Sequence, residues 1–170
     1  MDIQLHIDIA ATADRVWVTL GERFMQVGEW AAPISQSCAI DGGALGVGSV
    51  RECHTVGVGP VPPGTVSERL TVFAPDRHSL AYEAVSGMPR IVRSAVNRWS
   101  IEPLGATNCR VHMHITLVLS GIARLLTWPM RWQMRREGDR VLMDLKYFIE
   151  HGRAHPRKQL RAKPTLSVPE

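Results

Sequence analysis

The sequence predicts one α+β domain in which a curved, seven-stranded antiparallel sheet wraps around a single long C-terminal helix. Length and composition set the scale, because 170 residues with 45% hydrophobic and 21% charged content suit one domain with a substantial core. Much of the chain up to residue 119 alternates polar and apolar residues, as half-buried strands do. Only a segment near the C-terminus has a long helical period, so this helix is expected to cover one face of the sheet.

The N-terminal segment predicts a strand followed by two short helices. Residues 3–9 alternate strictly between apolar and polar side chains. Thr12 is a suitable N-cap for a helix over about residues 13–20. Gly21 interrupts that helix, and residues 22–30 then indicate a second short helix.

Six further strands are expected before the long helix. The period in this region is two, and short segments rich in Gly and Pro separate the alternating runs. Successive strands with such short connections predict an antiparallel meander. The expected strands are Ser35–Ile40, Gly48–Val56, Thr65–Phe73, Ser79–Val85, Ile91–Ile101 and Arg110–Leu119.

The last element is predicted to be a helix over about residues 129–151. Its apolar residues recur at steps of three and four, which places them on one face, and Gly152 is suited to end the helix. The chain beyond this point has no period and contains three prolines, so a basic, flexible tail is expected over residues 154–170. The apolar positions of the helix are Met134, Gly138, Val141, Leu142, Leu145, Phe148 and Ile149.

Four local patterns occur in a characteristic order along the chain. They are A-x-x-x-x-V-W after the opening strand (11–17), GVGSVR at the start of a strand (46–51), SERL in the next strand (67–70) and L-x-Y in the one after (80–82). In this order they resemble the START-like (SRPBCC) superfamily. That superfamily includes polyketide cyclase/dehydrase and lipid-transport proteins, birch-pollen-allergen-like proteins and plant abscisic acid receptors.

The resemblance covers residues 3–152 and implies a helix-grip fold. Residues 1–153 would then form a START-like ligand-binding domain, with a cavity for a hydrophobic ligand between the sheet and the last helix. The resemblance implies no single activity, because the superfamily contains enzymes, carriers and receptors. No catalytic residue can be transferred from it.

Glu68 is the leading candidate for chemistry. It shares the inward face of its strand with Val66, Leu70 and Val72. A carboxylate on an apolar face must be paired, hydrated or protonated, and such a group is one sign of a functional acid or base. The resemblance to the abscisic acid receptors also implies a glutamate that faces the pocket here.

The orientation of Arg51 is left open by the sequence. If Arg51 and Thr55 point inward, Arg51 can pair with Glu68 or bind an anionic group of the ligand. If the neighbouring valines set the buried face, Glu52 and His54 point inward instead. The receptor resemblance favours the inward Arg51.

Tyr82 and Ser94 add hydroxyl groups that are suited to orient a ligand in an apolar cleft. Tyr82 could equally be a core aromatic residue that bonds to the backbone. Glu68 and Tyr82 form the only pair of candidate catalytic residues. The predicted ligand contacts are Arg51, Thr55, Glu68, Tyr82, Ser94, Met113, Met134, Gly138 and Leu142.

We expect neither a metal nor a cofactor. His112 and His114 alternate with the apolar residues of their strand, and two histidines without a third ligand make a poor zinc site. No phosphate-binding loop or nucleophile elbow is present. The three cysteines, Cys38, Cys53 and Cys109, are far apart, which indicates a reducing compartment. With neither a basic leader nor an apolar run that could span a bilayer, a cytoplasmic protein is expected.

Basic residues gather near the C-terminus. Residues 1–120 contain nine Lys/Arg and eleven Asp/Glu, whereas residues 121–170 contain eleven and five. The basic segment 122–136 also carries Trp128 and Trp132, a combination that interfacial helices use at a lipid surface. We prefer a lid over the cavity mouth, since the segment is short and leads into the core helix.

A membrane surface is therefore not the favoured partner. Nucleic acid is not expected either, because the basic residues are not interleaved with stacking aromatics on strands. The chain is expected to be a monomer or a homodimer.

The leading hypothesis is a protein that binds a small hydrophobic or aromatic molecule between the sheet and the C-terminal helix. Whether it also transforms that molecule, as a polyketide cyclase/dehydratase-type enzyme would, is left open. The alternative is a non-catalytic carrier or chaperone for a lipid or quinone at a membrane surface.

Overall fold

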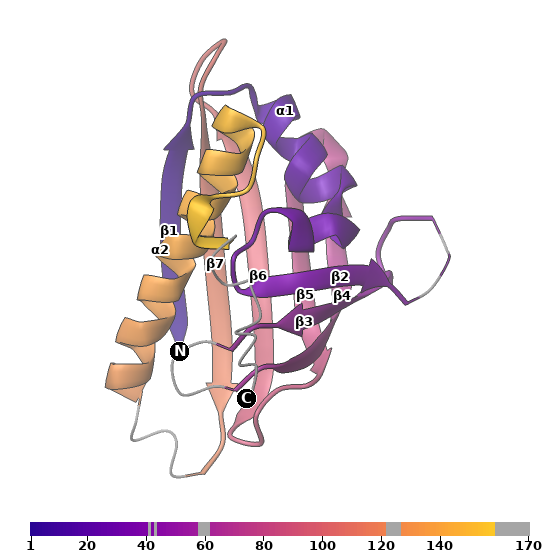
Figure 1. Ribbon diagram of the computed structural model, residues 1–170, viewed down its shortest axis with the longest axis vertical. Coiled ribbons are helices and arrows are strands. Elements are labelled where there is room, and N and C mark those ends of the chain that lie inside the picture. The colour runs from indigo at the N-terminus through magenta and orange to yellow at the C-terminus, as the bar shows by residue number, and fades with distance from the viewer. Residues whose placement is uncertain (41, 43, 58–61, 122–126, 159–170) are drawn as a thin grey trace, which may run out of the picture.

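The computed structural model confirms the helix-grip fold, with a seven-stranded antiparallel sheet curved around the long helix α2 (Figure 1). It describes residues 1–158 except 41, 43, 58–61 and 122–126. The strand order is β1-β7-β6-β5-β4-β3-β2, so the first strand pairs with the last and the others follow chain order. The strands are β1 (Asp2–Ile9), β2 (Ile34–Ala39), β3 (Val50–Thr55), β4 (Gly64–Ala74), β5 (Ser79–Ser86), β6 (Val92–Pro103) and β7 (Cys109–Leu119).

Helix α2 (Thr127–His151) lies across β1 and β7 in Figure 1. Pro129 falls in its first turn, where the missing backbone N–H is not needed. The helix ends as the sequence predicts, because Gly152 adopts a φ of 67° and its N–H donates to the Phe148 carbonyl at 2.9 Å. Leu142, Leu145 and Ile149 are buried against the sheet.

The helix approaches the sheet closely at Gly138. A β-carbon at this position would lie 2.4 Å from Leu5 Cδ1 and 3.0 Å from Met113 Cε. Leu5 and Met113 are direct partners on β1 and β7, and both are buried. The missing side chain therefore lets the helix backbone rest on these two strands.

Three short helical segments follow β1: α1 (Ala13–Trp17), the π-helical turn η1 (Val18–Glu22) and the 3-10 segment η2 (Phe24–Glu29). The predicted N-cap is present, since Thr12 Oγ1 accepts from the Arg15 N–H at 3.2 Å. The first α-helix ends at Trp17, earlier than expected. The Trp17 indole lies 2.5 Å from the position that a β-carbon of Gly21 would take. The wide π-helical turn therefore lets the Trp17 ring pack directly on the Gly21 backbone.

One predicted strand face is wrong beyond the middle of β4. Val72 was expected to point inward, but it is 45% exposed. The pairing of β4 with β5 shifts register between Leu70 and Val72, and such a shift turns the following side chains to the opposite face. Phe73 takes the inward position instead, with its ring centroid 5.5 Å from that of Trp17.

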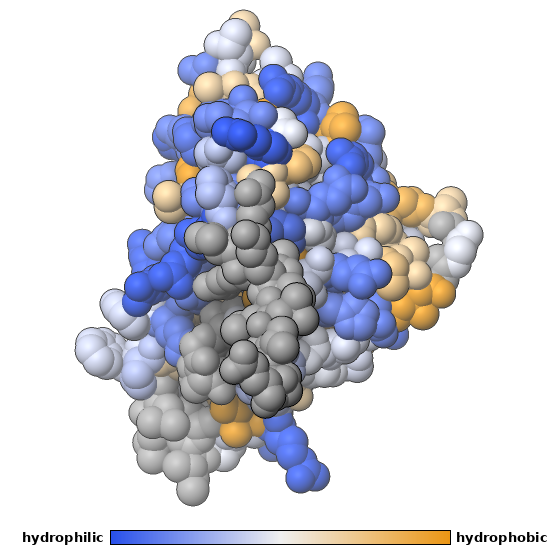
Figure 2. Space-filling model, viewed as in Figure 1, coloured by the Kyte–Doolittle hydropathy of each residue, from blue (hydrophilic) through white to orange (hydrophobic). Residues whose placement is uncertain are grey.

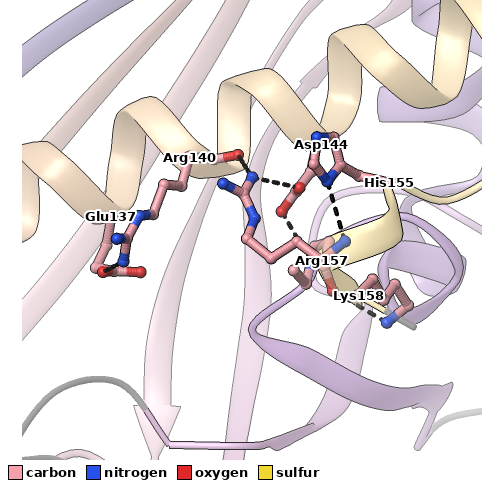
Figure 3. A network of polar contacts seen from close by, with 8 residues as sticks. Glu137, Arg140, Asp144, His155, Arg157 and Lys158 are labelled. Carbon is pink, nitrogen blue, oxygen red and sulfur yellow. Dashed lines mark hydrogen bonds and ion pairs between the residues drawn. The ribbon is translucent and has the colours of Figure 1, made fainter. Parts of the chain in front are cut away.

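Residues 154–158 run back against the domain, although the sequence predicted that a free tail begins there (Figure 3). The Arg157 guanidinium donates to the Asp144 carboxylate at 2.5 Å. The Lys158 ammonium donates to the Ala31 carbonyl at 3.1 Å. These two basic side chains find acceptors inside the domain, which composition alone could not reveal. The rest of the predicted tail lies outside the described residues.

The surface shows hydrophobic side chains over the connection between β2 and β3, where Ile40 and Val47 are exposed (Figure 2). None of the described helices is long and apolar enough to cross a membrane.

Candidate functional site

A cavity of about 270 Å³ lies between the sheet, α2 and the short helical segments. Its size is close to the lower end of the roughly 300–1,000 Å³ that small-molecule pockets occupy. Most of its wall is apolar, with a few polar groups. It is lined by Arg51, Glu68, Leu80, Tyr82, Asn97, Trp99, Met113 and Ile115 of the sheet, by Met134, Glu137, Gly138 and Val141 of α2, and by Thr19, Leu20, Arg23, Phe24, Val27, Trp30, Ala31, Pro33 and Ile34.

Arg51 points inward and is only 4% exposed. It lies directly opposite Glu68 in the pairing of β3 with β4, which places both side chains on one face. Its Nε donates to Glu68 Oε2 at 2.7 Å, its Nη2 is 2.7 Å from the same oxygen, and its Nη1 donates to the Phe24 carbonyl at 2.6 Å. Burial opposes the charge, yet the Glu68 carboxylate holds the pKa of Arg51 above its ordinary value.

Aromatic rings complete the surroundings of Arg51. Its guanidinium carbon lies 3.8 Å from the ring centroid of Phe24 and 4.7 Å from that of Tyr82. Glu52 and His54, the alternative inward residues, are only half-buried and contact one another at 3.5 Å. The orientation that the sequence left open is therefore the one with Arg51 inside.

The ion pair limits what Glu68 can do chemically. A carboxylate oxygen that faces two guanidinium nitrogens is poorly placed to give or take a proton during a reaction. The neighbouring Cys53 thiol lies 3.7 Å from the same oxygen. Burial, with the nearby Glu68 charge, raises the pKa of Cys53 to about 12, so the thiol stays protonated and is a weak nucleophile.

Tyr82 is half-buried and bonds to a side chain rather than to the backbone. Its phenol oxygen accepts from Asn97 Nδ2 at 3.0 Å. Burial, together with the Glu68 charge, raises the pKa of Tyr82 to about 12. The phenol therefore keeps its proton at neutral pH, and that proton can be donated to another acceptor.

Two enclosed acceptors in the cavity wall have no hydrogen-bond partner among the described residues. They are Asn97 Oδ1 and Glu137 Oε2. Glu137 is bound on its other oxygen by Arg140, a pair that Figure 3 shows on α2. Because buried acceptors are normally satisfied, the cavity suits a molecule that offers hydroxyl or N–H groups.

The predicted ligand contacts divide into three groups. Arg51, Glu68, Tyr82, Met113, Met134 and Gly138 line the cavity, while Leu142 is buried in the core beside it.

Thr55 and Ser94 lie elsewhere. The Thr55 hydroxyl is engaged by the backbone of Gly64, with both contacts at 3.1 Å. Ser94 lines a separate hollow at the β5–β6 connection, where the pairing of β6 with β7 shifts register between Val92 and Ser94.

Sequence reasoning missed four polar lining residues, Thr19, Arg23, Asn97 and Glu137, of which the two on β6 and α2 have a signal in the sequence. Asn97 precedes Trp99 by two positions on β6, so it shares the face of that buried ring. Glu137 follows Met134 by three positions and precedes Val141 by four, so it shares their side of α2. The apolar residues of η2 could not be assigned, because their place depends on how the short helices fold over the sheet.

The histidines of β7 lie away from the cavity, on the partly exposed face of the sheet. His112 Nε2 is 3.2 Å from a Glu102 oxygen and His114 Nε2 is 3.3 Å from an Asp2 oxygen. Across the part of the chain that the structure describes, no three His, Cys, Asp or Glu side chains gather at a place that could hold a metal ion.

The predicted lid is not formed by the tryptophans of α2. Trp128 is 81% exposed and Trp132 is 61% exposed, and neither lines the cavity. The preference for a lid is therefore wrong for these two residues. The preceding part of the segment, 122–126, lies outside the described residues.

Comparisons with known proteins give the same fold. A family model described as polyketide cyclase / dehydrase and lipid transport matches residues 1–150. A comparison with curated proteins finds no significant match. Among solved structures, the ZhuI aromatase/cyclase from Streptomyces sp. R1128 has a TM-score of 0.75 at 18% identity, covering 88% of this chain and 93% of that one.

Two further solved structures are similar over nearly their whole length. Ara h 8.0201 has a TM-score of 0.71 at 10% identity, covering 88% of this chain and 97% of that one. Truncated norcoclaurine synthase from Thalictrum flavum has a TM-score of 0.67 at 13% identity, covering 89% of this chain and 94% of that one.

Proposed function

Because this chain belongs to the polyketide cyclase/dehydrase and lipid-transport family, we propose that it binds one small, mainly apolar molecule that also carries a hydrogen-bond donor. The cavity between the sheet and α2 is the observation that carries this proposal. It combines an apolar wall with two enclosed acceptors that lack a partner among the described residues. The apolar body of the ligand would be held by burial, and its hydroxyl or amine group would be fixed by Asn97 or Glu137.

A pair of probes and a pair of variants test the binding site. Wild-type protein should bind 2-naphthol more tightly than naphthalene by roughly two- to twelvefold, the effect of one hydrogen bond. Val141→Trp should weaken 2-naphthol binding by roughly tenfold or more, because the indole would occupy the cavity. Met143→Trp is the matched control, since Met143 is exposed on the same helix. Binding is measured by calorimetry, and equal affinities of the two variants would place the ligand elsewhere.

Acid–base chemistry on the bound molecule is the second candidate function, and Tyr82 is the residue that favours it. Its phenol is protonated at neutral pH, lies in the cavity wall and has its oxygen already engaged by Asn97. Its proton would then be offered to the ligand, as a general acid for dehydration or ring closure requires. We propose Glu68 as a residue that fixes Arg51, not as the acid.

The pKa of Tyr82 is expected to be raised only in the folded protein, because burial causes the shift. The chain has two tyrosines, so Tyr82→Phe should remove the ionisation near pH 12 from the native absorbance titration. Below about pH 10 neither the folded nor the unfolded chain has lost the Tyr82 proton. As the pH rises further, the unfolded chain loses the Tyr82 proton before the folded chain does. The contribution of this group to the free energy of unfolding therefore falls as the pH approaches 12.

The same variant separates binding from catalysis. A compound that co-purifies with the protein can be identified by native mass spectrometry and then used as the substrate. Product formation that falls roughly 10²–10⁴-fold in Tyr82→Phe at unchanged affinity would support proton donation. If both tyrosines of the native wild-type protein ionise near pH 10, the pKa of Tyr82 is not raised and its phenol is not enclosed.

A further inference from the structure

The outer side of the first turns of α2 carries two tryptophans that the core does not use. Trp128 and Trp132 are 81% and 61% exposed, whereas the other three tryptophans, Trp17, Trp30 and Trp99, are buried. A spacing of four residues places the two rings on the same side of the helix. Large aromatic residues at such exposure are costly to keep in water unless something covers them.

Basic side chains surround these rings. Arg131, Arg135 and Arg136 are exposed, and residues 127–136 contain no acidic residue. The Arg136 guanidinium carbon lies 5.5 Å from the ring centroid of Trp132. Within the described ranges, no carboxylate forms an ion pair with Arg131 or Arg135. This outer face of residues 127–136, here called the Trp–Arg face, is therefore both aromatic and positively charged.

We propose that the Trp–Arg face docks on an anionic lipid surface. Indole rings reside at the boundary between headgroups and acyl chains, and guanidinium groups beside them bind lipid phosphates. A nucleic acid is a poorer fit, because three arginines over two turns cannot follow a phosphate backbone and residues 1–120 carry more acidic than basic side chains.

Docking would bring the lipid surface next to the cavity. Trp132 and Arg136 lie on the outer side of these helical turns. Met134, Glu137 and Gly138 lie on the inner side of the same turns and line the cavity. One wall of the cavity thus lies directly behind the Trp–Arg face. It follows that the ligand is taken from, or returned to, a membrane, and this step rests on the proposed function.

Flotation of the full chain with vesicles tests the docking. Vesicles of phosphatidylcholine with phosphatidylserine should retain roughly tenfold more protein than phosphatidylcholine alone, and added salt should reduce this binding. Trp128→Ala with Trp132→Ala should lose most of it, and so should Arg131→Gln with Arg135→Gln. Met143→Ala and Arg153→Gln are the controls, because both residues are exposed and lie outside the Trp–Arg face. Thermal unfolding checks that each variant is folded.

Three outcomes would overturn the proposal. The first is equal retention of the wild-type protein on neutral and anionic vesicles, and the second is undiminished vesicle binding by the tryptophan variant. The third is that neither wild type nor variant binds vesicles, while the variant loses a self-association that the wild type shows. The last outcome would assign the face to a second copy of the chain. Binding of 2-naphthol in solution is measured in parallel, so a failure of docking is distinguished from a failure of the cavity.

Discussion

Replacing Arg157 by alanine is expected to lower the free energy of unfolding by about 3–5 kcal/mol, the usual effect of removing one partner from a buried ion pair. Its partner Asp144 is 0% exposed. Without Arg157, the Asp144 carboxylate would keep one hydrogen bond among the described residues, from the Ala32 backbone N–H at 3.0 Å, with the Lys158 charge nearby. One neutral donor cannot replace a guanidinium for a carboxylate that water does not reach.

Urea denaturation of a small variant series checks this result. Asp144→Asn in the Arg157→Ala background should recover part of the loss, because the amide still accepts from Ala32 but carries no charge. Arg153→Ala is the control, since Arg153 is exposed in the same stretch of chain. A loss below about 1 kcal/mol for Arg157→Ala would mean that water satisfies Asp144 in the native protein.

The ion pair of the cavity is expected to respond differently to single and double replacement. Glu68→Leu should cost about 3–5 kcal/mol, because it leaves the enclosed charge of Arg51 with the Phe24 carbonyl and two rings. Arg51→Met should cost less, since the Glu68 side chain is 20% exposed and can be hydrated. The double variant should lie within about 1–2 kcal/mol of wild type.

A double-mutant cycle measured by denaturation decides this point. Additive losses would show that Arg51 and Glu68 contribute separately and that the pair is weak. The exposed pair of Arg69 and Glu83, 3.8 Å apart on β4 and β5, provides a matched comparison and should show little coupling.

The strands and the long helix were predictable because each has a strong period and a clear stop signal. Every predicted strand is present, and Gly152 ends α2 as expected. Side-chain direction was less secure, because it depends on register. The shifts beside Val72 and Ser94 arise from pairing between strands, which a single strand's sequence does not encode.

The candidate site was predictable only where one element decides the direction of a side chain. Met134 and Gly138 follow from the phase of α2, and Glu68 follows from the alternation of β4. Arg51 needed its partner on the neighbouring strand to be placed. Asp144 was missed altogether, because its partner Arg157 comes from a segment without any period.

The contacts of residues 155–158 couple the stability of this C-terminal segment to that of one wall of the cavity. Lys158 donates to the carbonyls of Ala31 and Ile34, and Asp144 accepts from the Ala32 N–H, so the segment that forms one wall of the cavity is held from behind (Figure 3). The free energy of ordering that wall and the free energy of docking residues 155–158 on it are therefore coupled. By linkage, a molecule that fills the cavity tightens the C-terminal segment as much as that segment tightens its binding. Residues 155–158 are thus expected to act as an intramolecular effector of the cavity.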